Sequence, residues 1–131
     1  MHPYRKLVES RLEQAARCLK SAETLLEDGD FKGAANRAYY CVFHAMRSLL
    51  ALENMDFKKH SAIMSYFRQK YIKAGELEGR LSEILTDLVQ ARTESDYEDY
   101  FEITRGEAQE QIDNAEFFYE KIRAYVSPLM G

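Results

Sequence analysis

The sequence predicts an all-α fold, an up-and-down four-helix bundle with one additional short helix. The two prolines, Pro3 and Pro128, stand near the ends of a chain of 131 residues, so its long interior holds no proline to break a helix. Strand-favouring Val, Ile and Thr are few, and hydrophobic residues make up 46%, enough for one core. We therefore expect a single helical domain over residues 1–131.

The first two helices are predicted from apolar residues spaced three and four apart, over residues 4–27 and 31–53. In the second helix this stripe comprises Phe31, Ala34, Ala38, Cys41, Ala45, Leu49 and Leu52. Gly29 can end the first helix in a left-handed conformation, and Asp30 can cap the second. Such a short connection predicts an antiparallel hairpin, in which Cys18 and Cys41 would lie opposite each other as free thiols.

The second half of the chain predicts three more segments of helix. After a polar connection at 53–56, a shorter helix is expected over residues 59–71 and a fourth over residues 76–93. The acidic and aromatic residues 94–100 lack a helical period and predict a loop. Thr104 and Glu107 fit a capping box, which indicates the start of a last helix that ends before Pro128.

Charge and motifs exclude several functional classes. The net charge is −4, yet residues 31–73 carry eight basic side chains against two acidic ones, which suits a phosphate-bearing partner unless the charges merely solvate helices. No apolar run is long enough to span a membrane and the first residues do not resemble a signal peptide, so a cytoplasmic location is expected. No glycine-rich phosphate loop or metal-ligand spacing occurs, and we expect neither a metal nor a cofactor.

The second predicted helix carries a polar stripe beside its apolar one. Its members, spaced three, four and three residues apart, are Arg37, Tyr40, His44 and Arg47. A guanidinium can bind phosphate oxygens, a phenol can stack on a base, and an imidazole can move a proton near neutral pH. The alternative is that these side chains only cover an edge of the core.

Two smaller groups of residues are further candidates. Lys59 and His60 open the short helix, where free backbone N–H groups and positive charge would favour an anion. The alternative is a basic loop that only improves solubility. Arg92 and Asp96 are four residues apart and can form an ion pair, whose role is more simply structural than catalytic.

The chain resembles the HEPN domains (higher eukaryotes and prokaryotes nucleotide-binding), in particular the small stand-alone prokaryotic branch. The resemblance rests first on Asn36-Arg37-Ala38-Tyr39-Tyr40 followed by Phe43-His44-Ala45. Further matching segments follow in the expected order: residues 22–26 with 29–31, Lys59-His60, Arg92 with Ser95-Asp96-Tyr97, and residues 115–118. The resemblance implies a helical bundle that commonly forms homodimers. Family members bind nucleotides or RNA, cleave RNA without metal through an Arg and a His, or pair with a small nucleotidyltransferase in toxin–antitoxin systems.

The leading hypothesis is a domain that binds a nucleotide or RNA, without DNA specificity, together with a nucleotidyltransferase partner. The binding residues would be Asn36, Tyr40, Arg47, Lys59, His60, Arg92 and Asp96. One alternative is a metal-independent endoribonuclease with Arg37 and His44 as catalytic residues, in which a homodimer groove unites two such pairs because one His cannot easily be both acid and base. Another is a structural dimerisation module without catalysis.

Overall fold

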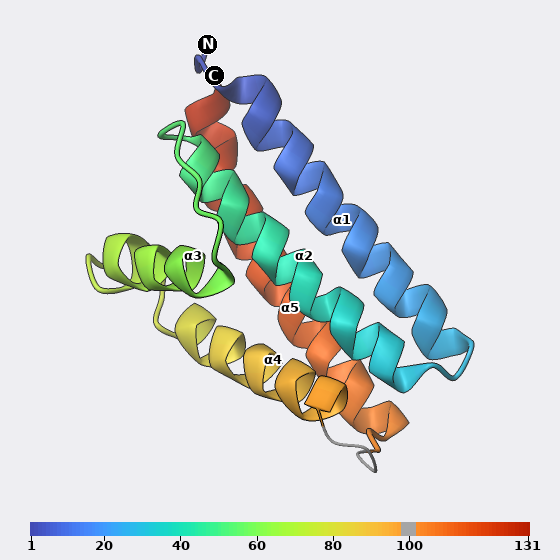
Figure 1. The fold of residues 1–131 in the computed structure, drawn as a ribbon. Helices are drawn as coiled ribbons and strands as arrows, with labels where there is room; N and C mark the ends of the chain where they lie inside the picture. Colours follow the sequence, from blue (N-terminus) through green and yellow to red (C-terminus); the bar gives the residue numbers. More distant parts are fainter. Residues whose placement is uncertain (98–101) are drawn as a thin grey trace.

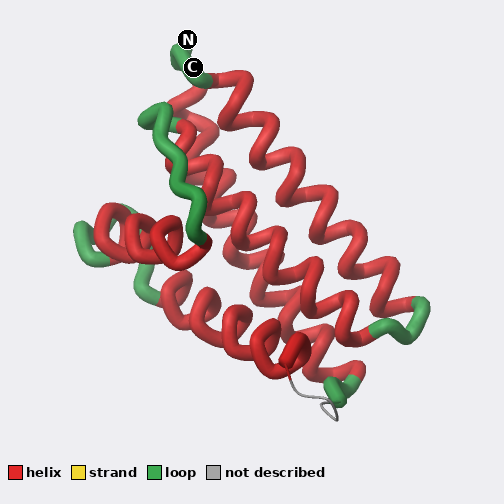
Figure 2. Tube along the Cα trace, in the orientation of Figure 1, coloured by secondary structure: helices red, strands yellow, loops and turns green. Residues whose placement is uncertain are grey.

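The computed structural model describes the backbone of residues 1–97 and 102–131 and, apart from residues 95–97, their side chains. Within these ranges every regular element is a helix, and loops join the helices without any strand (Figure 2). The elements in chain order are α1 (Arg5–Glu27), α2 (Phe31–Ala51), α3 (His60–Phe67), η1 (Arg68–Ile72), α4 (Arg80–Tyr97), α5 (Arg105–Val126) and η2 (Ser127–Met130). The predicted all-α bundle with an additional short helix is therefore confirmed.

The four long helices form the bundle, and α3 lies at its side (Figure 1). Helices α1, α2 and α5 run side by side along its length, with α4 packed next to α2 and α5. Helix α3 continues into a π-helical turn, η1, before the chain reaches α4. None of the helices in the described ranges is long and apolar enough to cross a membrane.

Local sequence signals fix the hairpin of α1 and α2. Gly29 adopts a φ of +84°, the left-handed conformation that a side chain would disfavour. The Asp30 carboxylate then accepts a hydrogen bond of 2.9 Å from the backbone N–H of Gly33 and caps α2. Both predicted roles are confirmed.

Cys18 and Cys41 are free thiols, as predicted. Burial, followed by the neighbouring Cys18 thiol, raises the pKa of Cys41.

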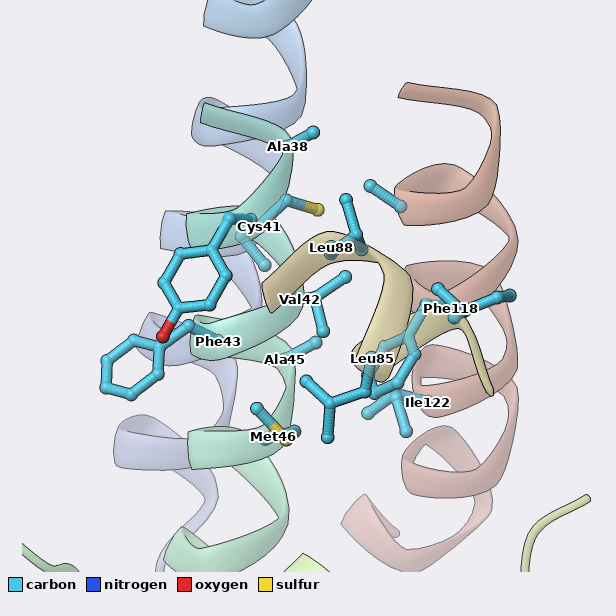
Figure 3. Packing of buried hydrophobic residues seen from close by; sticks show 14 of the residues in the cluster. Ala38, Cys41, Val42, Phe43, Ala45, Met46, Leu85, Leu88, Phe118 and Ile122 are labelled. Carbon is cyan, nitrogen blue, oxygen red and sulfur yellow. The ribbon is translucent and has the colours of Figure 1, made fainter. Parts of the chain in front are cut away.

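Helix α2 is the central helix, because it contacts each of the other four α-helices. The predicted stripe is largely buried, but so are residues on its other sides: Tyr39, Val42, Phe43 and Met46. In Figure 3, Val42 and Met46 lie among Leu85 and Leu88 of α4 and side chains of α5. A single apolar stripe describes a helix covered on one face, whereas neighbours surround α2.

The predicted loop at residues 94–100 is wrong for residues 94–97, because α4 continues through Tyr97. Contacts one turn apart support its last turns: Thr93 donates to the carbonyl of Val89, and Gln90 donates to the Glu94 carboxylate at 3.0 Å. Residues 98–100 of the predicted loop lie outside the described residues. The capping box that begins α5 is confirmed, with both reciprocal hydrogen bonds of Thr104 at 3.1 Å.

Candidate functional site

Four polar side chains of α2 lie in a row on its half-buried flank. Arg37, Tyr40, His44 and Arg47 are all partly exposed. The Arg37 guanidinium carbon is 5.0 Å from the centroid of the Tyr40 ring, and the rings of Tyr40 and His44 are 6.3 Å apart. These contacts place a cation, a phenol and an imidazole next to one another along one helix.

The start of α3 brings a second imidazole to the same flank. The His60 ring packs 4.1 Å from the ring of Phe43 and 6.1 Å from that of Tyr40, measured between centroids. A hydrogen bond of 2.9 Å joins Nδ1 of His60 to the hydroxyl of Tyr39. We call Tyr39, Tyr40, Phe43, His44 and His60 the aromatic cluster.

Helix α4 adds an arginine to the aromatic cluster. The guanidinium carbon of Arg92 lies 4.7 Å from the centroid of Tyr39 and 5.5 Å from that of Tyr40. Its Nη2 also donates to the Tyr40 hydroxyl at 3.4 Å. Tyr40 therefore contacts two cations, Arg37 and Arg92, which stabilise its ring through cation–π interactions.

The remaining predicted residues have different surroundings. Asn36 accepts hydrogen bonds from Nε (3.3 Å) and Nη2 (3.0 Å) of Arg37, so it orients that guanidinium. Lys59 is exposed at the N-cap of α3, directly before His60. The backbone of Asp96 lies in α4 one turn after Arg92, while its side chain is outside the described residues.

Arg47 is held mainly by an ion pair that the sequence did not reveal. Asp56, in the segment before α3, accepts from Arg47 at 2.7 Å and from Arg11 of α1 at 3.3 Å. Arg11 is only 7% exposed and also donates to the Arg47 carbonyl at 2.9 Å. The sequence did contain a signal for a buried arginine, because Arg11 follows Val8 by three residues and precedes Ala15 by four, on the buried face of α1.

Tyr39 and Phe43 were also missed as site residues. Both belong to α2 but lie outside its polar stripe, and they are 1% and 6% exposed. The residues that cover them, His60 and Arg92, come from α3 and α4. Only the packing of α3 and α4 against α2 shows that the rings of Tyr39 and Phe43 form the buried side of the site.

Burial and neighbouring arginines keep both imidazoles neutral. Burial first, and then Arg47 and Arg37, lower the pKa of His44 from its ordinary value of 6.5. Burial and then Arg92 lower the pKa of His60 in the same direction. At neutral pH the cluster therefore combines permanent arginine charge with uncharged imidazoles.

This arrangement suits an anion with an attached aromatic base. Guanidinium groups bind phosphate oxygens, and a tyrosine ring can stack on a base. Among the described side chains, those of residues 1–94 and 102–131, no group of three His, Cys, Asp or Glu residues could hold a metal ion.

Fold and site together define a small helical domain with a basic, aromatic site on its central helix. The model of the HEPN domain family matches residues 8–125, and the chain belongs to this family. "Putative toxin MJ0142" from Methanocaldococcus jannaschii is 28% identical over 94% of this chain and 84% of that protein. A "UPF0332 protein" from Thermotoga maritima is 27% identical over 98% of both chains.

A solved structure shares the fold. It is the crystal structure of TT1696 from Thermus thermophilus, which superposes with a TM-score of 0.76 at 22% identity. The alignment covers 90% of this chain and 97% of that one. A second protein of M. jannaschii, "Putative toxin MJ0605", is 29% identical over 96% of this chain and 93% of its own length.

Proposed function

We propose that this chain is a toxin-like HEPN domain that binds RNA or a nucleotide at the aromatic cluster. One observation carries the proposal: two guanidinium groups, from Arg37 and Arg92, lie 5.0 and 5.5 Å from the centroid of the partly exposed Tyr40 ring. Cations held against an aromatic ring can bind a phosphate while the ring stacks on the attached base.

The surroundings support the same ligand. The excess of basic side chains in residues 31–73 attracts a polyanion. Two relatives carry the name putative toxin, and both align with more than nine-tenths of this chain. A toxin-like domain that acts on RNA is consistent with both facts.

Binding of a labelled single-stranded RNA of mixed sequence, followed by fluorescence anisotropy, tests the proposal. Arg37→Ala and Arg92→Ala should each weaken binding by about tenfold, because a stacking or charge-assisted contact contributes roughly 1–3 kcal/mol. The matched control is Arg105→Ala, whose guanidinium lies 5.2 Å from the centroid of Phe31, away from the cluster. Equal losses of affinity in all three variants would contradict the proposal. A wild-type protein that binds neither the RNA nor ATP would contradict it as well. DNA of the same sequence should compete no better than RNA.

A metal-independent endoribonuclease is the second candidate, favoured by the position of His44 in the same row as Arg37. Arg37 would stabilise charge on the phosphorus centre and His44 would move a proton, with two copies meeting across a homodimer groove. Cleavage of RNA in the presence of EDTA should then be lost in His44→Ala. Equal cleavage by both proteins would indicate a contaminating nuclease.

Partners are part of the proposal. We propose that the chain forms a homodimer and is neutralised by a small nucleotidyltransferase encoded beside it. Light scattering after size exclusion measures the first, and co-expression with that nucleotidyltransferase measures the second. If Arg37→Ala and His44→Ala change only the dimer dissociation constant, the chain is instead a structural dimerisation module.

A further inference from the structure

The hydrogen bond between Tyr39 and His60 has a definite direction. Tyr39 is 1% exposed, so its hydroxyl is buried, and within the described part of the chain its one hydrogen bond is the contact of 2.9 Å to Nδ1 of His60. A buried hydroxyl proton needs an acceptor. If Nδ1 carried the proton, the Tyr39 O–H would have none. The satisfied arrangement is that Tyr39 donates to Nδ1 and the proton of His60 is on Nε2.

In His44 the proton is assigned to the same nitrogen, Nε2, for a different reason. Its Nδ1 is buried and has no hydrogen-bond partner among the described residues. A buried N–H without an acceptor is rare in folded proteins, while an unpaired lone pair is tolerated better. The proton of a neutral His44 is therefore also on Nε2. The residue as a whole is partly exposed, so the ring can present this edge to a ligand.

We infer that His44 and His60 serve as neutral hydrogen-bond donors through Nε2–H to the phosphate oxygens of the ligand, and that Tyr39 is the positioning residue that fixes this form in His60. The inference rests on the proposed binding of RNA or a nucleotide. Phosphate oxygens only accept hydrogen bonds, so donors on both imidazoles fit them. Such a site complements the arginines, which supply the charge.

The charges around both rings favour the neutral form. Arg47 and Arg37 on α2, Arg11 on α1 and His60 on α3 face His44, and Arg92 on α4 and Arg47 face His60. Burial is the largest cause that lowers the pKa of each imidazole, and these arginines lower it further. Burial likewise raises the pKa of Tyr39, although Arg92 opposes it, so its hydroxyl keeps the proton that it donates.

The Nε2–H tautomers of His44 and His60 limit what the site can do to RNA. A general base needs an unprotonated nitrogen that reaches the 2′-hydroxyl, whereas here the unprotonated Nδ1 is buried in His44 and bonded to Tyr39 in His60. In this form they stabilise negative charge on phosphate oxygens and do not remove a proton. The second histidine is in the same protomer, so both donors act without a dimer.

Nuclear magnetic resonance of the wild-type protein tests the inference directly. Long-range ¹H–¹⁵N correlations at neutral pH should show both rings as the Nε2–H tautomer. Tyr39→Phe should leave His44 unchanged, convert His60 to a mixture of tautomers and raise its pKa, because the hydrogen bond to the neutral form is lost. Tyr66→Phe, whose hydroxyl donates to Glu53, is the matched control and should change neither ring. An Nδ1–H tautomer or an imidazolium on either ring would overturn the inference, whether or not RNA binds.

The pH dependence of RNA binding provides the functional readout. At constant ionic strength the affinity of the labelled RNA should change less than about twofold between about pH 6.5 and about pH 9. If a charged imidazole were required, affinity would fall about tenfold per pH unit above its pKa. That fall would overturn the inference and leave RNA binding established. Absence of binding at every pH would refute the proposed function and the ligand role of both imidazoles, while the tautomers would still report the effect of Tyr39.

Discussion

Replacing Asp56 with asparagine tests the ion pairs that tie α1 and α2 to the segment before α3. The Asp56 carboxylate binds Arg47 at 2.7 Å and Arg11 at 3.3 Å, and it also accepts the Phe57 N–H. Partial burial opposes its ionisation, yet these hydrogen bonds and charges hold the pKa of Asp56 below its ordinary value. Asparagine keeps the size and one acceptor oxygen but removes the negative charge.

The expected loss follows from the exposure of the partners. The Arg11 side chain is 9% exposed and that of Asp56 is 40% exposed. Breaking a fully buried pair costs about 3–5 kcal/mol, and an exposed pair contributes about 0–1 kcal/mol. Arg11 also keeps its bond to the carbonyl of Arg47. We therefore expect Asp56→Asn to lower the free energy of unfolding by about 1–3 kcal/mol.

Urea denaturation followed by circular dichroism measures this loss. Glu13→Gln is the matched control, because its partner Arg17 and Glu13 itself are 73% and 63% exposed, and it should cost at most about 0.5 kcal/mol. Combining Asp56→Asn with Arg11→Met should give a loss smaller than the sum of the two single losses. Equal losses for Asp56→Asn and the control, or strict additivity, would refute the reasoning.

Three further outcomes are expected in the same assay. Thr104→Ala removes the side-chain cap of α5 and should cost about 1 kcal/mol, and an unchanged midpoint would contradict the capping box. Leu88→Ala empties a 1% exposed core position and should cost about 2–5 kcal/mol, whereas the 47% exposed Leu129 should tolerate the same change. The lowered pKa values of His44 and His60 mean that the unfolded chain binds more protons below about pH 6.5. The stability that the two neutral histidines contribute should therefore be fully present above that pH and be lost as pH falls through their folded-state pKa values. Combining His44→Gln with His60→Gln should flatten this decline.

The hairpin of α1 and α2 shows what a local signal can determine. A glycine suited to the left-handed conformation and an aspartate that caps the next helix are properties of adjacent residues. The same holds for the capping box of α5. These interactions form within a few residues, so the sequence predicts them without knowledge of the rest of the chain.

The end of α4 and the burial of α2 show where that reasoning fails. Residues 94–97 lack an apolar period but are helical, with backbone turns and side-chain contacts one turn apart at their start. Tyr39 and Phe43 lie outside the apolar stripe of α2, yet they are buried because His60 and Arg92 cover them. Periodicity reports one covered face, and a central helix has several.

For the candidate site, the sequence by itself determined the row of Arg37, Tyr40 and His44, since a helix brings residues three and four apart to one face. Only the tertiary structure decided that His60 and Arg92 join this row. They are separated from it by long stretches of chain, and their positions depend on how α3 and α4 pack against α2. The protonation state inferred for each imidazole has the same origin, because burial and a partner from another helix determine which nitrogen holds the proton.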